Sequence, residues 1–191
     1  MIRFALVLCA VASPLVAQDH GHSPYAGLEA REIKSLSEAD IEELRRGGGW
    51  GLALPAELNG VPGPAHLLEL RDEIGLDADQ IAAIEAIFRR MQADAREAGA
   101  RFIDAEAALE AAFRAGTLEP AHLRDLIDAA AAARADLRFV HLSRHLDMPR
   151  LLGDAQIARY DALRGYGAGD PCSAVPAGHD PAMWRRHNGC D

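Results

Sequence analysis

Two histidines four residues apart, His141 and His145, are the strongest candidates for chemistry in this sequence. On an α-helix this spacing puts both imidazoles on one face, one turn apart, where they could chelate a single Zn²⁺, Cu²⁺, Ni²⁺ or Co²⁺ ion. Met148 lies on the same face and adds a soft thioether donor that would favour copper. The alternative is that both histidines lie partly exposed at the solvated end of a helix pair and bind no metal.

Other histidines could contribute to such a site. His66 belongs to a helix that precedes the long pair and could come close to the same end. His20 and His22, in a polar N-terminal arm, could donate to the same ion or belong to a disordered remnant of the leader. Glu119 and His122 have the spacing of half a di-iron carboxylate site, but they lie at a helix-pair tip and not in a bundle core. We therefore set that last pair aside.

The pattern that must position these histidines is a stripe of apolar residues spaced three and four apart over residues 80–115, which predicts one long helix packed against another. The stripe comprises Ile81, Ile84, Phe88, Met91, Ala95, Ala98, Phe102, Ala105, Leu109 and Ala112. After a break at Gly116 and Thr117, a second stripe begins at Leu123 and continues into His141 and His145. The sequence therefore predicts a long antiparallel helical hairpin, with the two histidines facing inward at its open end.

Shorter helices are expected on both sides of the hairpin. Ser37 is a good N-cap for the first of them, residues 50–58 could form another, and Pro64 suits the first turn of a third, which Gly75 closes. Asp77 can cap the long helix. Pro149 is expected to end the return helix before a last amphipathic helix. The fold class is therefore predicted to be all-α.

The first residues have the features of an export signal. Arg3 supplies a positive charge, the apolar run 4–16 is too short to span a bilayer, and Ala17 is a small residue suited to cleavage. No other stretch could cross a membrane. We expect cleavage after about Ala17 and an exported product, most simply in a bacterial periplasm.

Composition limits the classes of function. The net charge of −9 argues against nucleic acid as a partner and is suited to attracting cations. Aromatic residues make up only 5% of the chain and alanine is abundant, which favours closely packed helices. Because two long helices cannot bury both of their faces against each other, we expect a homodimer.

The tail contains the two cysteines of the mature chain, Cys172 and Cys190. In an oxidising compartment a disulfide between them is the default expectation. Zinc ligation together with His179 and His187 is the alternative, although the spacing is not that of a zinc finger or ribbon.

Two similar pentads open helices after loops: Leu76-Asp77-Ala78-Asp79-Gln80 and Leu152-Gly153-Asp154-Ala155-Gln156. They resemble the Leu-Thr-x-x-Gln signature of the periplasmic Spy/CpxP family, with both threonines replaced and both glutamines kept. The order of leader, helix, pentad, hairpin, pentad and helix is also similar to that family and to the related heavy-metal-resistance proteins of ZraP and CnrX type. The resemblance covers about residues 62–166. Together with the features of the two ends, this divides the chain into a signal peptide (1–17), an arm with short helices (18–61), the hairpin domain (62–166) and an irregular tail (167–191).

The resemblance implies a non-enzymatic, all-helical, dimeric periplasmic protein that acts in metal response or envelope stress. In the nickel sensor of this group, metal is held by histidines of the first helix, a glutamate and a His-x-x-x-Met pair. His66 resembles the first of these ligands and Met148 the last, but Arg144 and Phe88 stand near the places of the paired histidine and the glutamate. The nickel site therefore does not transfer intact.

We therefore expect a periplasmic metal-binding protein of heavy-metal sensing or resistance, or of the envelope stress response. His141 and His145 would be its main ligands, with His66 and Met148 as auxiliary ones. The alternative is a Spy/CpxP-like chaperone that holds unfolded clients on a surface of apolar and arginine side chains. No nucleophile–base pair, phosphate loop or catalytic carboxylate pair stands out, so no enzymatic activity is expected. The metal, the client and any envelope regulator that binds the protein stay open.

Overall fold

The computed structural model describes residues 23, 25–166, 172, 175, 181–187 and 189–190. It divides into two compact units, Met1–Ala30 and Arg31–Asp191. The described part of the first unit contains one 3₁₀ turn, η1, at Leu28–Ala30. The predicted leader, with His20 and His22, lies outside the described residues.

The described residues form helices and no strand, which confirms the predicted all-α class. In the second unit the elements are α1 (Glu38–Arg46), α2 (Leu54–Glu57), α3 (Pro64–Glu69), α4 (Arg71–Ile74), α5 (Ala78–Ala115), α6 (Pro120–His145), η2 (Met148–Arg150), α7 (Asp154–Arg164) and α8 (Pro181–His187). Within this described part, no helix combines the length and the apolar character that crossing a bilayer requires. A disulfide joins Cys172 and Cys190, whose Cα atoms are 5.3 Å apart.

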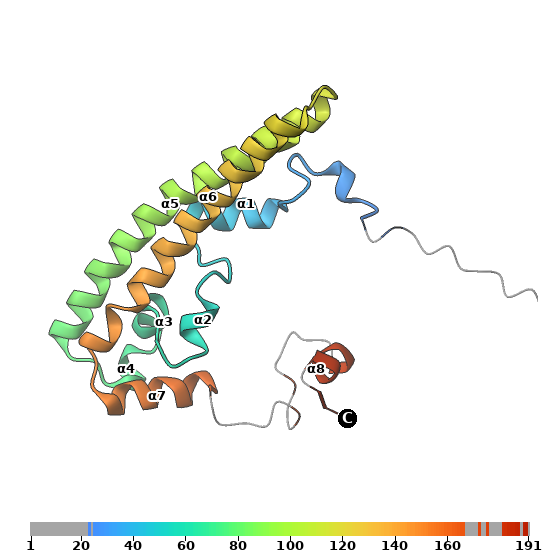
Figure 1. The fold of residues 1–191 in the computed structure, drawn as a ribbon. Coiled ribbons are helices and arrows are strands. Elements are labelled where there is room, and N and C mark those ends of the chain that lie inside the picture. The colour runs from blue at the N-terminus through green and yellow to red at the C-terminus, as the bar shows by residue number, and fades with distance from the viewer. Residues whose placement is uncertain are drawn as a thin grey trace, which may run out of the picture. The chain divides into compact units, whose positions relative to one another are not determined.

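The longest helices, α5 and α6, lie side by side (Figure 1). Asp77 begins α5 with a capping box, because its side chain accepts from Gln80 N while the Gln80 side chain accepts from Asp77 N. Gly116 ends α5 with a φ of 71°, a left-handed conformation that glycine adopts without a steric penalty. Pro120 then occupies the first turn of α6.

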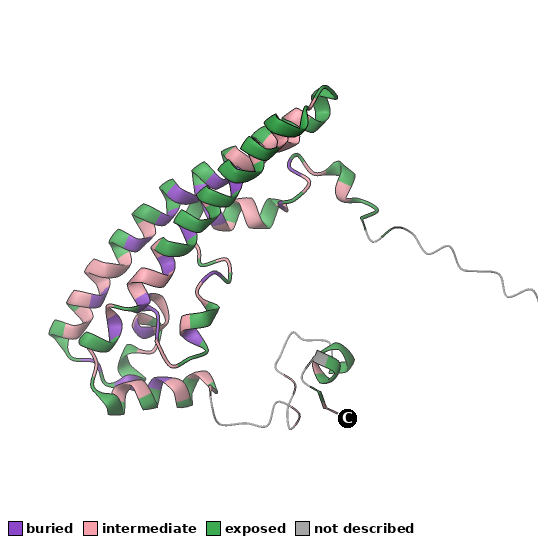
Figure 2. Ribbon diagram, in the orientation of Figure 1, coloured by how far each residue is buried: buried purple, intermediate pink, exposed green. Residues whose placement is uncertain are grey.

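Burial is uneven along this pair of helices. On α5 the buried positions run from Ile84 to Ile103. From there to the turn at Gly116 every residue is half-buried or exposed, as Figure 2 shows. The predicted apolar stripe is therefore a core only where other helices cover the pair.

Helix α1 covers the middle of α5 at close backbone distance. A Cβ added at Gly99 would lie 2.7 Å from the Leu44 carbonyl oxygen, and one at Gly47 would lie 2.7 Å from the Gln92 carbonyl oxygen. Two glycines therefore allow this approach. It buries Leu44 completely and helps to form a core with Ala95, Ala98 and Phe102.

A second core lies where α3, α4 and α7 meet the start of α5. Its buried members are Leu67, Ile74, Leu76, Ile84, Met148 and Tyr160. The predicted helix from Pro64 to Gly75 is in fact two short helices that meet at Leu70, where φ is −104° and ψ is 16°. No proline or glycine inside this stretch marks the break in advance.

Candidate functional site

A cleft of about 560 Å³ opens between α3, the loop that follows α1, the first half of α5 and the last turns of α6. Three histidines line this cleft: His66, His141 and His145. A cavity of this size is in the range that holds a small ligand. The helical framework therefore brings the predicted histidines to one place.

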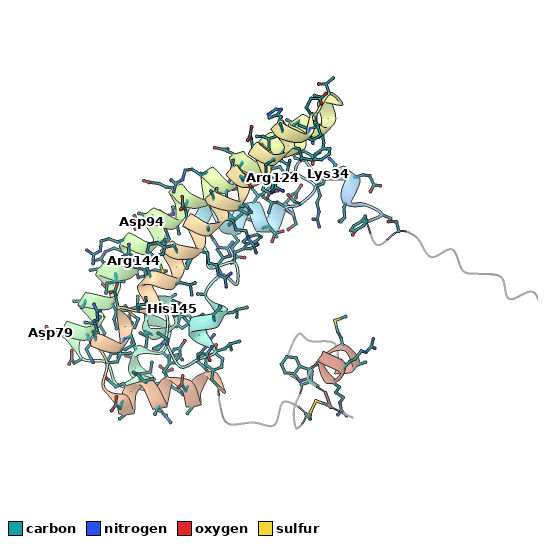
Figure 3. All side chains as sticks on the ribbon, in the orientation of Figure 1. Lys34, Asp79, Asp94, Arg124, Arg144 and His145 are labelled. Carbon is teal, nitrogen blue, oxygen red and sulfur yellow. A yellow bond between two sulfur atoms is a disulfide. The ribbon has the colours of Figure 1, made fainter. Side chains whose placement is uncertain are left out.

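Both members of the histidine pair are buried. His141 is 3% exposed and His145 is 6% exposed, so neither ring projects into bulk solvent. Figure 3 shows His145 at the end of α6 that lies nearest α3. The interpretation of a solvated helix end, which the sequence left open, does not describe this pair.

The ring of His145 is fixed by the chain that precedes α3. Its Nδ1 lies 2.7 Å from the carbonyl oxygen of Val61. Because a carbonyl can only accept, Nδ1 carries a proton, and in the neutral ring Nε2 keeps its lone pair. The ring also presses against Gly63, where an added Cβ would lie 2.8 Å from Nε2. A metal-binding histidine is commonly oriented through its second nitrogen in this way.

The Nε2 atom of His141 is buried and has no hydrogen-bond partner. Burial lowers the pKa of His141 below its usual 6.5, and the neighbouring His145 lowers it further; a hydrogen bond to the backbone of Gly48 and the charge of Glu43 only partly oppose these effects. His141 is therefore neutral at neutral pH. A buried polar atom without a partner costs about 1–3 kcal/mol, so this nitrogen is a place where a ligand would be favourable.

The sequence analysis missed the most highly connected side chain of the site, Glu57. It is 5% exposed and lies on the short helix α2. Its Oε1 accepts from Tyr160, from Nδ1 of His66 at 3.0 Å and from Tyr166 at 3.1 Å. Nε of Arg164 is 3.5 Å from the same oxygen. One carboxylate oxygen thus joins α2 to α3 and to the end of α7.

The other oxygen of Glu57, Oε2, is buried and has no hydrogen-bond partner. It lies 4.0 Å from Nδ1 of His145. Burial alone would raise the pKa of Glu57, but the hydrogen bonds from His66 and Tyr160 outweigh it and bring the pKa down to about 2. The same arrangement, through burial and the Glu57 carboxylate, raises the pKa of Tyr160. Glu57 is therefore a buried, ionised carboxylate with one side unsatisfied.

The two auxiliary candidates lie in different places. His66 lines the cleft, and because its Nδ1 donates to Glu57, its Nε2 keeps the lone pair in the neutral ring. Met148 is fully buried in the second core with Leu67 and Tyr160, and it is not among the residues that line the cleft. A different thioether, that of Met91 on α5, does line the cleft.

These donors surround the cleft without forming a ready-made cage. Among the residues that the structure describes, no three His, Cys, Asp or Glu side chains are arranged to hold a metal ion. The arrangement offers a pair of imidazoles one helical turn apart. Any further ligand to an ion held there would have to be water, a backbone carbonyl, a thioether or a side chain that moves.

The glycine-rich loop beside the cleft holds Trp50 in an unusual conformation. Its φ is 43°, in the left-handed region that bulky residues rarely adopt. Several contacts hold it there: its ring nitrogen donates to Asp40 at 2.8 Å, its backbone nitrogen donates to Glu43 at 2.9 Å, and its ring lies 5.5 Å from that of Phe102. The contacts of this tryptophan therefore fix the loop that forms one wall of the cleft.

No family model matches this chain, and neither a curated protein nor a solved structure matches it. Conclusions about function therefore depend on the residues of the cleft and on the sequence pattern.

Proposed function

We propose that this is an exported protein that binds a divalent transition-metal ion in the cleft through His141 and His145. The observation that carries the proposal is the unpartnered, buried Nε2 of a neutral His141, one helical turn from a second imidazole whose Nδ1–H donates to a backbone carbonyl. A transition-metal ion needs such neutral nitrogen donors, and it binds them at about 2.0–2.1 Å.

The charge of the cleft supports a cationic ligand. Glu43, Glu57 and Glu69 line it, against the single guanidinium of Arg46. Two of the three histidines that line it are held with Nδ1 as the donor, so that Nε2 is free to bind an ion when the ring is neutral. An acidic cleft with imidazole donors favours Zn²⁺, Cu²⁺, Ni²⁺ or Co²⁺ over an anion.

The biological setting is proposed from the sequence. The leader-like first 17 residues support export to a periplasm, and the two glutamine pentads support a Spy/CpxP-like hairpin protein of heavy-metal sensing, heavy-metal resistance or envelope stress. In this proposal the protein is a homodimer without enzymatic activity. Its partner is an envelope regulator or an unfolded client.

Equilibrium dialysis of the mature protein against Zn²⁺, Cu²⁺, Ni²⁺ and Co²⁺ tests the binding. The wild type should bind at least one of these ions with a stoichiometry of about one per chain, and the His141→Ala/His145→Ala variant should lose that ion. His122→Ala is the matched control, because it removes an exposed imidazole from the same helix. Unchanged stoichiometry in the double variant would reject the histidine pair as the site.

The chaperone alternative has an observation of its own. Phe139 on α6 and Leu146, the C-cap residue that follows α6, are 71% and 67% exposed. They are seven residues apart and therefore lie on one face of the helix, about opposite to the buried Leu137. We propose that both side chains belong to a client-binding surface, since a contiguous exposed apolar patch commonly marks a site that binds another protein.

Aggregation of a reduced, unfolding client measures that activity. If the protein is a chaperone, the wild type and the His141→Ala/His145→Ala variant should both suppress aggregation. A Phe139→Ser/Leu146→Ser variant should suppress it several-fold less. Equal suppression by the serine variant would exclude this face as the client-binding surface.

A further inference from the structure

The least expected group in the cleft is the free oxygen of Glu57. We infer that Glu57 is the counter-charge of the cation site: its carboxylate attracts and retains a divalent cation at His141 and His145 without being a ligand of that cation. This inference rests on the proposed function and adds to it a residue that determines which charge the site accepts.

The two oxygens of this carboxylate have very different surroundings. Oε1 takes hydrogen bonds from His66, Tyr160 and Tyr166, and it lies near Arg164. Oε2 is buried with no hydrogen-bond donor, and Nδ1 of the His145 ring lies 4.0 Å from it. The unsatisfied side of the negative charge therefore faces one of the two proposed metal ligands.

The neutralising groups on the Oε1 side are weak. Both tyrosines donate hydrogen bonds without bringing a positive charge, and the side chain of His66 is 37% exposed, so water screens part of any charge that its ring carries. Arg164 is the single guanidinium next to Glu57 among the described residues, and its side chain is 30% exposed, so water screens part of its charge. A buried carboxylate whose ion-pair partners are both partly screened keeps a net negative potential in the cleft.

That potential acts on a metal site in two ways. It attracts the ion directly, by an energy proportional to the charge of the ion. It also stabilises the positive charge that coordination places on the His145 ring, as carboxylates next to metal-bound histidines commonly do. Losing an outer carboxylate of this kind typically costs about 10–100-fold in metal affinity.

A purely structural role is the competing explanation, since Glu57 joins α2 to α3 and α7. That role needs the hydrogen bonds to Oε1 and does not need the negative charge. Glu57→Gln keeps the shape and one acceptor oxygen while it removes the charge. If the role is structural, the affinity for every ion should change by the same factor, or not at all.

The first experiment compares Zn²⁺ with Ag⁺, a monovalent ion that imidazole also binds, in chloride-free buffer. In the folded Glu57→Gln variant, Zn²⁺ affinity should fall about 10–100-fold, and Ag⁺ affinity by about the square root of that factor, 3–10-fold. Glu69→Gln is the matched control, because it removes an exposed carboxylate from the same cleft; it should change either affinity by less than about threefold.

A second variant decides the matter if Glu57→Gln does not fold. Arg164→Gln removes the cation beside Glu57 but keeps the carboxylate, so the cleft becomes more negative. Zn²⁺ should then bind about 3–10-fold more tightly. A structural role predicts the opposite sign, since losing a contact of the network can only loosen the site.

The results separate the inference from the proposed function. If the wild type binds no ion, or if binding survives in the His141→Ala/His145→Ala variant, the proposed function fails and the inference falls with it. If the wild type binds through the histidine pair, the proposed function stands. The inference alone is then overturned by equal losses for Zn²⁺ and Ag⁺ in Glu57→Gln, or by Zn²⁺ affinity in Arg164→Gln that is unchanged or weaker.

Discussion

Gln80 and Gln156 exchange a pair of amide hydrogen bonds across 76 residues of sequence. Nε2 of Gln80 donates to Oε1 of Gln156 at 2.9 Å, and Nε2 of Gln156 donates to Oε1 of Gln80 at 3.0 Å. Each amide also accepts from the backbone nitrogen at the start of its own helix and donates to a carbonyl near the other, Leu151 or Gly75. The two similar pentads thus meet face to face and fix α7 against the start of α5.

We predict that the two glutamines act as one unit. Gln80→Ala or Gln156→Ala should each lower the free energy of unfolding by about 1–3 kcal/mol, because each removes the side-chain acceptor of a capping box and takes hydrogen bonds away from its partner amide. The double variant should cost clearly less than the sum, with a coupling energy of about 0.5–3 kcal/mol. Urea unfolding followed by circular dichroism gives all three values. Additive losses would show that the amide pair contributes nothing as a pair.

Gly63 provides a test of how tightly the His145 ring is held. A Cβ there would lie 2.7 Å from Cε1 and 2.8 Å from Nε2 of the ring, whereas φ is −95°, which any residue adopts. The overlap should therefore make Gly63→Ala destabilising by about 1–3 kcal/mol, in addition to the cost of placing alanine at an N-cap.

Gly153→Ala is the control for that measurement. Gly153 is also an N-cap with a negative φ, of −84°, but the nearest atom to its added Cβ is 4.0 Å away. Both variants share the cost of alanine at an N-cap, so their difference in unfolding free energy isolates the contact with His145. Equal values would mean that the ring moves aside without cost.

Several helix starts and ends of this chain could be predicted from the sequence, since they depend on local chemistry, whereas the break at Leu70 could not. Ser37 and Asp77 cap α1 and α5, and Gly116 ends α5, as their residue types indicate. The sequence also predicted that Met148 would lie on the same helical face as the two histidines. The structure does not place it there, because the α-helical geometry ends at His145. The 3₁₀ turn η2 that follows directs Met148 into the second core.

The role of Glu57 in the cleft could not be predicted from the sequence either, because apolar residues are exposed and a charged residue is buried at α2. Its flanking leucines, Leu54 and Leu58, are 53% and 59% exposed, while the glutamate between them is buried. Hydrophobic periodicity would predict buried leucines and an exposed glutamate, the reverse of what the structure shows. The hydrogen-bond partners of Glu57 are 9 to 109 residues away in the sequence. They lie on α3, on α7 and just after α7, so no local motif marks the network.

The depressed pKa of Glu57 predicts a loss of stability in acid. Its value in the folded state is about 2, below the ordinary 4.5, so the unfolded chain binds the proton first as the pH falls. The stability that this carboxylate supplies is complete above about pH 5 and is lost progressively down to about pH 2; it amounts to about 3 kcal/mol.

Urea unfolding at pH 6, 4 and 3 measures that loss. Glu57→Gln should be less stable than the wild type at pH 6 but should lose less on acidification, so the two profiles converge. Glu69→Gln, which removes an exposed carboxylate, should keep the wild-type profile. Parallel profiles for wild type and Glu57→Gln would contradict the assigned pKa.

The lowered pKa of His141 predicts a separate effect nearer neutrality. Because burial and His145 disfavour its charged form in the folded state, the unfolded chain takes up a proton that the folded chain refuses as the pH falls below about 6.5. Stability should therefore decrease from pH 7.5 to pH 5.5, with a slope of at most about 1.4 kcal/mol per pH unit from this group.

His141→Gln should flatten this part of the profile, whereas His122→Gln, at an exposed position of the same helix, should not. Unfolding in the presence of a chelator removes any contribution from bound metal, and a His141→Gln profile as steep as that of the wild type would refute the assignment.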